Sequence, residues 1–158
     1  MPRIIPSRLQ PADPMWFVGE RRDLPLAEAA DRIGSLWDDF MLTVPLPGQI
    51  GPETYGITCA FDGENMGYLA GVRVENFENL DAGMPEGRIA VPQAEYAVFT
   101  HVGPNDTIQH TWEGIMEWVR TNGRFVDGDS PPLEIYGDAY SSGNPNSQFE
   151  IWFPVKLA

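Results

Sequence analysis

Apolar and polar residues alternate along residues 148–156, which read Q-F-E-I-W-F-P-V-K. Side chains two positions apart lie on the same face of a strand, so this pattern predicts a strand with two unlike faces. One face is apolar and typical of a core, and it consists of Phe149, Ile151, Phe153 and Val155. The other face carries Glu150 beside Trp152. If this second face is open to solvent, Glu150 has no special role. If it lines a cavity, the carboxylate loses hydration and must acquire a cation, a hydrogen-bond donor or a proton.

Apolar residues recur at helical spacing in two segments, which predicts two helices. The first stripe is Leu26, Ala30, Ile33, Trp37 and Phe40. The second stripe is Ile108, Trp112, Ile115 and Val119. Pro25 suits the first turn of the first helix. Asp106 is a candidate N-cap for the second helix, with Gln109 placed as its capping-box partner, and Gly123 is placed to end that helix.

Segments rich in aromatic and β-branched residues predict the strands. They lie at residues 15–22, 55–61, 67–74, 88–91, 96–102, 133–140 and 148–156. Short turn segments join 55–61 to 67–74 and 133–140 to 148–156, so each pair is expected to form a hairpin. The proline-rich residues 1–14 are expected to form an arm or a short edge segment.

The two halves of the chain follow the same order of strand, helix, strand and strand. Equivalent positions are 80 to 82 residues apart: Trp16 and Tyr96, Leu26 and Ile108, Tyr55 and Ile135, Tyr68 and Phe149. Such spacing indicates an internal repeat, with one unit at about 15–76 and the other at about 88–157 of a single domain, 1–158. The predicted fold is α+β, with duplicated strand–helix–strand–strand units in one antiparallel sheet. We expect two helices on one face of this sheet and a ligand cleft on the opposite, concave face.

The composition argues for a folded domain and against nucleic-acid-binding and membrane-spanning proteins. The 158 residues include 42% hydrophobic and 11% aromatic residues, enough to build a core. With ten Lys and Arg against 23 Asp and Glu, the net charge of −13 argues against direct nucleic-acid binding, which needs a basic surface. The acidic balance serves solubility and mildly favours cationic ligands. No apolar run is long enough to span a membrane and no signal peptide is evident, so a cytoplasmic location is expected.

Four motifs in the second half form an ordered series. They are Y-A-V-F-T-H-V-G-P at 96–104, T-W-x-x-I-x-x-W at 111–118, L-E-I-Y-G at 133–137 and F-E-I-W-F-P-V-K at 149–156. The series resembles the GyrI-like family, which includes the effector-binding domains of AraC- and MerR-type transcription regulators. The resemblance is good from about residue 88 to the end and much weaker over 15–80.

The resemblance implies the duplicated α+β fold and an aromatic-lined ligand cavity that contains a buried acidic residue. In the family pattern the acid lies on the last strand, which corresponds to Glu150, and the aromatic residue after L-E-I corresponds to Tyr136. We therefore expect a binding protein for a lipophilic, possibly cationic, small molecule, of the multidrug-sensing type. Neither predicted helix is basic, so a stand-alone member without a DNA-binding helix-turn-helix is expected. The expected ligand-binding residues are Glu150, Trp152, Tyr136, Tyr140, Trp112, Tyr55 and Tyr68, although simple packing is an alternative for several of them.

Two other functions remain open. Some stand-alone relatives hydrolyse electrophilic cyclopropane-bearing compounds, and Glu150 and Tyr136 would be the catalytic residues of such a hydrolase. The protein could instead be a protein-interaction module, as gyrase inhibitors of this family are. No cofactor or metal site is expected, because His101 and His110 lack partners at metal-ligand spacing and the single cysteine, Cys59, excludes a cysteine-rich site.

Overall fold

In the computed structural model, which describes residues 3–78, 80, 82–141 and 144–158, nine strands form one antiparallel sheet with two α-helices. The helices are α1 (Ala29–Met41) and α2 (Ile108–Thr121). The strands are β1 (Arg8–Ala12), β2 (Met15–Pro25), β3 (Thr54–Phe61), β4 (Asn65–Val74), β5 (Gly87–Val91), β6 (Ala94–Val102), β7 (Phe125–Asp127), β8 (Leu133–Tyr136) and β9 (Gln148–Leu157). Short 3₁₀ turns at Leu26–Glu28 and Asn105–Thr107 lead into the two helices.

The order of strands across the sheet is symmetric. The path runs β1-β6-β9-β8-β3-β4-β2-β5, with β7 attached to β9. The units β2-α1-β3-β4 and β6-α2-β8-β9 therefore meet at the β3–β8 pair, each contributing its strands in mirrored order. The predicted α+β fold, with its duplicated strand–helix–strand–strand units, is confirmed.

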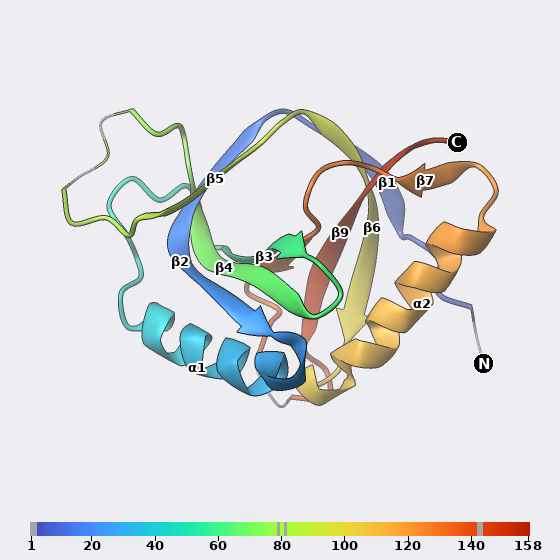
Figure 1. Cartoon of the computed structure of the whole chain (residues 1–158), viewed down its shortest axis with the longest axis horizontal. Coiled ribbons are helices and arrows are strands. Elements are labelled where there is room, and N and C mark those ends of the chain that lie inside the picture. The colour runs from blue at the N-terminus through green and yellow to red at the C-terminus, as the bar shows by residue number, and fades with distance from the viewer. Residues whose placement is uncertain (1–2, 79, 81, 142–143) are drawn as a thin grey trace.

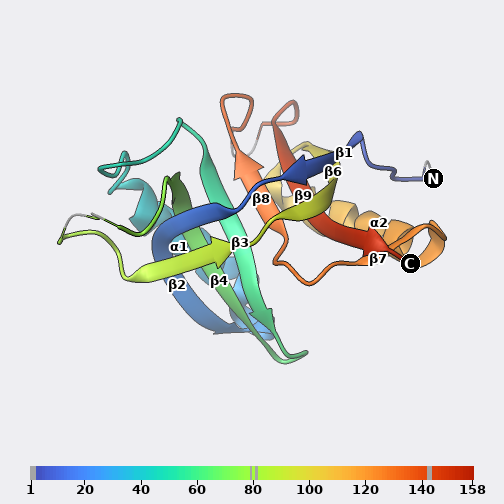
Figure 2. The same cartoon turned by 90° about the horizontal axis from the view of Figure 1, so that it is seen from above.

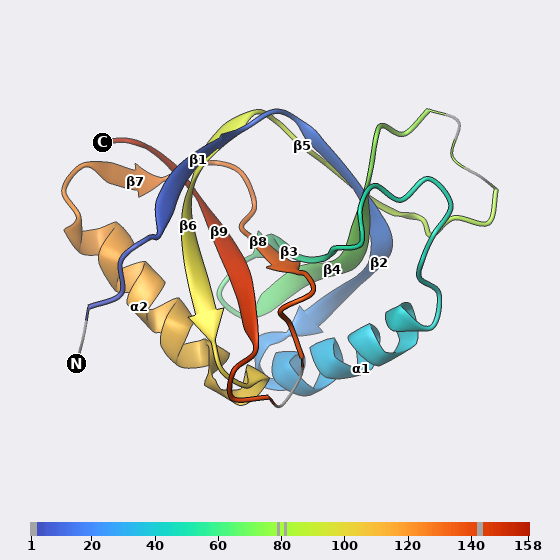
Figure 3. The same ribbon diagram turned by 180° about the vertical axis from the view of Figure 1, so that it is seen from behind.

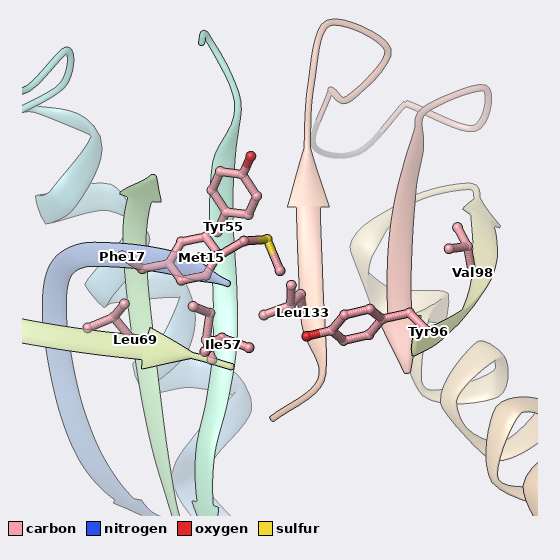
Figure 4. Close-up of a cluster of buried hydrophobic side chains, with 9 residues drawn as sticks. Met15, Phe17, Tyr55, Ile57, Leu69, Tyr96, Val98 and Leu133 are labelled. Carbon is pink, nitrogen blue, oxygen red and sulfur yellow. The ribbon is translucent and has the colours of Figure 1, made fainter. Parts of the chain in front are cut away.

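A long two-stranded ribbon crosses from one half to the other on the side of the sheet away from the helices. The chain passes from β1 on β6 into β2 on β5, so that Ala12 pairs with Ala94 and Met15 pairs with Val91 (Figure 2). Between this ribbon and the central strands lies a buried apolar cluster, which we call the back cluster (Figure 4). It consists of Met15, Phe17, Tyr55, Ile57, Leu69, Val91, Tyr96, Val98 and Leu133. The face opposite the helices is thus filled by core side chains.

Both helices lie on the other side of the sheet, as expected (Figure 1). Leu36 and Phe40 of α1 pack on Tyr68 and neighbouring residues of β4, while Ile115 of α2 packs on residues of β6 and β9. Burial of these large side chains, worth about 1.5–3 kcal/mol each, holds each helix on its own half of the sheet. Neither α1 nor α2, the α-helices in the described part of the chain, is long and apolar enough to cross a membrane.

Some element boundaries differ from the sequence-based expectation. The ladder between β2 and β4 continues to the pair Pro25–Asn65, and the Leu26 amide then donates to the Glu64 carbonyl at 2.9 Å, so α1 begins later than predicted. The N-cap of α2 is Thr107, without a side-chain cap, so the predicted capping box at Asp106 is wrong. Backbone hydrogen bonding also ends β8 at Tyr136, earlier than predicted.

Candidate functional site

A cavity of about 1390 Å³ lies between the two helices and the centre of the sheet. Its floor comes from β3, β4 and β8, and its walls come from α1 and α2. The β3–β4 hairpin and the connector at 127–132 form parts of its rim. The prediction of a cleft on the face opposite the helices is therefore wrong. That face is occupied by the back cluster, whereas the diverging helices leave the middle of their own face uncovered.

The Glu134 carboxylate is the polar centre of this cavity. Its Oε1 accepts hydrogen bonds from the Tyr136 hydroxyl at 2.9 Å and the Tyr68 hydroxyl at 3.0 Å. Its Oε2 accepts a longer one, at 3.4 Å, from Nε1 of Trp112. The Tyr68 hydroxyl in turn accepts from Nε1 of Trp37 at 3.0 Å. One carboxylate thus ties together both helices and two strands.

Strand alternation explains why Glu134 faces this way. In β8, Leu133 and Ile135 pack with the back cluster, so Glu134 and Tyr136 point to the helix side. The register places Gly56 of β3 directly opposite Glu134. A Cβ at Gly56 would collide with the Tyr68 hydroxyl and lie 2.7 Å from Oε1 of Glu134. The glycine therefore provides the space in which this hydrogen-bond network closes.

Burial controls the ionisation of these groups. It raises the pKa of Glu134, while the hydrogen bonds from Tyr136, Tyr68 and Trp112 oppose that rise by stabilising the charged form. Burial, reinforced by the Glu134 charge, raises the pKa of the Tyr68 and Tyr136 hydroxyls well above the ordinary tyrosine value. Both tyrosines therefore remain neutral donors to the Glu134 side chain.

Aromatic rings surround this carboxylate. The Tyr136 ring packs edge-on against Trp37, with centroids 5.3 Å apart, and against Tyr140 at 4.6 Å. Trp112 packs against Phe153 at 6.5 Å. Because the faces of such rings are electron-rich, they attract cations as well as apolar groups.

The charges along the cavity are of one sign. Glu134, Asp38, Asp127 and Asp129 contribute to its lining, and none of the lining residues in the described part of the chain is Lys, Arg or His. Asp129 has a partner outside the cavity, since Nζ of Lys156 lies 3.4 Å from its Oδ1. Burial raises the pKa of Asp127, and the nearby Asp129 charge adds to that rise. The cavity is therefore electrostatically suited to positive ligands.

Four of the residues expected from the sequence line the cavity together. They are Tyr68, Trp112, Tyr136 and Tyr140. Tyr68 and Trp112, which belong to different halves, meet at the carboxylate of Glu134. The Tyr140 hydroxyl accepts a hydrogen bond at 2.7 Å from Nδ2 of Asn105, which orders the end of the cavity near α2.

Glu150, Trp152 and Tyr55 do not line it. Glu150 lies on the back of the sheet, where it pairs with Arg8 through contacts of 2.8 and 3.3 Å. It also accepts a hydrogen bond at 3.1 Å from Nε1 of Trp152. Trp152 packs on the back cluster and Tyr55 belongs to it. The structure does not bring Glu150 and Tyr136 together as a catalytic pair, because they project from opposite faces of the sheet.

Glu150 was expected in the cavity but lies on the back of the sheet. The alternation of apolar and polar residues defines the two faces of a strand, but it does not show which face lines the cavity. In β9 the helix side takes the apolar face of Phe149, Ile151 and Phe153. Glu134 and Trp37 were not among the ligand-binding residues expected from the sequence. The signal for Glu134 was available, since the two-residue period places it on the same face as Tyr136.

Comparison with known proteins relates nearly the whole chain to a family and to solved structures. Residues 8–155 match the family described as "Cass2: Integron-associated effector binding protein". The transcriptional regulator BrlR of Pseudomonas aeruginosa is 29% identical over 128 residues, which cover 79% of this chain and 47% of BrlR. The chain thus spans about half the length of this regulator.

Solved structures share the fold. The structure of SAV2435 bound to tetraphenylphosphonium superimposes with a TM-score of 0.76 at 20% identity, covering 94% of this chain and 93% of that one. The C-terminal domain of EcmrR gives a TM-score of 0.67 at 20% identity, covering 96% of this chain and 97% of that domain. At such identities the likeness concerns the fold alone.

The family match extends over nearly the whole chain, and the fold agrees with it. The resemblance to GyrI-like effector-binding domains is thereby confirmed. The chain belongs to the Cass2 family of integron-associated effector binding proteins.

Proposed function

We propose that the protein binds a lipophilic organic cation in the cavity between α1 and α2, with the Glu134 carboxylate as its counter-ion. The observation that carries this proposal is the hydrogen-bonded Glu134 carboxylate in an aromatic cavity whose described lining contains no basic side chain. A bulky cation gains electrostatic attraction from the carboxylate and cation–π attraction from the rings, of about 0.5–2 kcal/mol.

The preformed network supports binding without a large ordering cost. Tyr68 and Tyr136 already donate to the carboxylate, so Glu134 does not have to reorganise to meet a cation. A cation bound nearby lowers the cost of keeping Glu134 ionised while buried. The tetraphenylphosphonium in the SAV2435 structure is a ligand of this chemical kind and serves as a probe.

Two probes of nearly the same shape and opposite charge test the proposal, namely tetraphenylphosphonium and tetraphenylborate. Wild-type protein should bind the phosphonium more tightly than the borate in a calorimetric titration. Glu134→Gln should weaken phosphonium binding by about tenfold to hundredfold, corresponding to about 1–3 kcal/mol for a charge-assisted contact. Borate binding should hold or improve.

Glu150→Gln is the matched control, because it makes the same chemical change on the back of the sheet. It should leave the preference for the phosphonium intact. An equal loss of both probes in Glu134→Gln would mean that Glu134 acts by shape alone. No preference for the phosphonium in the wild type would refute the proposal.

A further inference from the structure

A second, smaller pocket adjoins the cavity where α1 ends and β3 begins. Its volume is about 380 Å³. It is lined by Met41, Val44, Pro45, Leu46, Gly48, Gln49, Gly51, Pro52 and Thr54. Met41 and Thr54 also line the large cavity, so the two spaces adjoin at these residues. We call the smaller space the side pocket.

The two spaces differ in charge. The large cavity has carboxylates along its lining, whereas no lining residue of the side pocket in the described part of the chain is charged. Thr54, only 9% exposed, pairs with Tyr136 across the β3–β8 ladder and therefore stands beside the Glu134 network. A molecule that reached from Glu134 past Thr54 would pass from an acidic, aromatic environment into an uncharged one whose lining includes the apolar side chains of Val44 and Leu46.

The loop that forms the side pocket is held in place. It leaves the end of α1 and returns to the sheet beside β4, where the Ile50 amide donates to the Arg73 carbonyl at 2.8 Å (Figure 3). The Gln49 side chain accepts from the Leu46 amide at 3.0 Å and donates to the Gly51 carbonyl at 3.1 Å.

Apolar packing adds to this support. Val44 and Leu46 pack on the same buried cluster that contains Tyr68, which belongs to the floor of the large cavity. The side pocket is therefore built onto the core of the first half and is already open before a ligand arrives.

We infer that the ligands of this protein are amphiphilic cations, whose charged aromatic head lies at Glu134 and whose uncharged apolar tail enters the side pocket past Met41 and Thr54. This inference rests on the proposed function and deepens it. The head is selected by charge. The tail is selected by the apolar area that it removes from water.

An alkyl series measures the tail separately from the head. Methyl-, butyl- and octyltriphenylphosphonium share one head and differ only in tail length, and they are titrated below the concentrations at which they self-associate. For wild-type protein the affinity should rise by roughly fourfold for each methylene that becomes buried, the equivalent of about 0.8 kcal/mol per methylene, until the side pocket is full.

Pro52→Trp places a large ring in the side pocket and should flatten this dependence on tail length, while methyltriphenylphosphonium still binds, because Pro52 lines the side pocket and not the large cavity. Leu42→Trp is the matched control, since Leu42 is 86% exposed and lines neither space. It should retain the wild-type dependence.

The outcomes separate the two hypotheses. Binding of the methyl compound without any gain from longer tails would overturn the side-pocket inference alone. The same would follow if Pro52→Trp kept the wild-type dependence on tail length. Failure of the methyl compound to bind would overturn the proposed function and the side-pocket inference together.

Discussion

At the scale of single residues, the two glutamates on neighbouring strands show how environment decides the role of a carboxylate. Glu134 accepts three hydrogen bonds from neutral donors inside an aromatic cavity. Glu150 meets a guanidinium and an indole on the back of the sheet, with about a third of its side chain exposed. The hydrogen bond and charge of Arg8 lower the pKa of Glu150, whereas burial raises the pKa of Glu134.

The raised pKa of Glu134 predicts how the stability of Glu134→Gln, relative to wild type, depends on pH. A group with a raised folded pKa contributes stability that is present below its unfolded pKa, about 4.3, and is lost as the pH rises through the folded pKa. Glutamine does not ionise, so Glu134→Gln does not lose this stability as the pH rises. The melting temperature of Glu134→Gln relative to wild type should therefore increase between acidic and neutral pH in thermal unfolding without ligand. A difference that stays constant with pH would contradict the assigned burial of the charge.

Glu150→Gln should behave in the opposite way. The folded pKa of Glu150 is lowered, so its ion pair stabilises the protein above the unfolded pKa and ceases to do so as the pH falls through the folded pKa. Because the pair is partly exposed, the substitution should cost at most about 1 kcal/mol at neutral pH. Thermal unfolding measures this cost. A titration with tetraphenylphosphonium should show unchanged affinity. If Glu150→Gln instead weakened phosphonium binding, the ligand would bind on the back of the sheet, near Glu150.

At the scale of elements, the meeting of β3, β4 and β8 creates the site. Gly56 on β3 leaves room for the hydroxyl of Tyr68 on β4 to reach Glu134 on β8. The helices contribute Trp37 and Trp112 from either side. Each half of the repeat supplies part of the network, so the site requires both.

Gly56→Ala tests this close packing. The added methyl must displace the Tyr68 hydroxyl, so we expect a loss of about 1–3 kcal/mol of stability, the usual cost of overpacking, together with weaker phosphonium binding. Chemical denaturation and calorimetry measure the two effects. Gly83→Ala is the control, because a Cβ there meets open space. In Gly56→Ala with Tyr68→Phe, removal of the hydroxyl should restore part of the stability but not the affinity. No effect of Gly56→Ala on either quantity would refute the described packing.

Local sequence patterns predicted the helices and strands of this fold well. They did not predict which face of the sheet carries the cavity. Periods of two and 3.6 residues specify which side chains share a face, and the near-constant spacing between halves specifies the repeat. They do not specify the long crossing of β1–β2 over β5–β6, which depends on pairing between distant segments. That ribbon covers the back of the sheet, where Glu150 lies, so the open cavity is on the helix side with Glu134.

At the scale of the whole molecule, the two faces of the sheet differ. The ribbon covers the back of the sheet, whereas the helices leave the centre of the other face open. The ribbon and the back cluster give the sheet a core of its own. The sheet therefore does not need the helices to cover it completely, and they can stand apart over its centre (Figure 1). The cavity of about 1390 Å³ exceeds the usual 300–1,000 Å³ of small-molecule pockets, which suits a bulky ligand.

The most direct test of this account is to locate a bound cation by its anomalous scattering. Crystals grown with tetraphenylarsonium, an analogue of the phosphonium probe, would reveal the arsenic position without interpretation of ligand shape. We predict one arsenic peak between α1 and α2, beside the carboxylate of Glu134 and the rings of Trp37 and Trp112. A peak on the back of the sheet, beside Glu150 and Trp152, with the inter-helix cavity empty, would contradict the account.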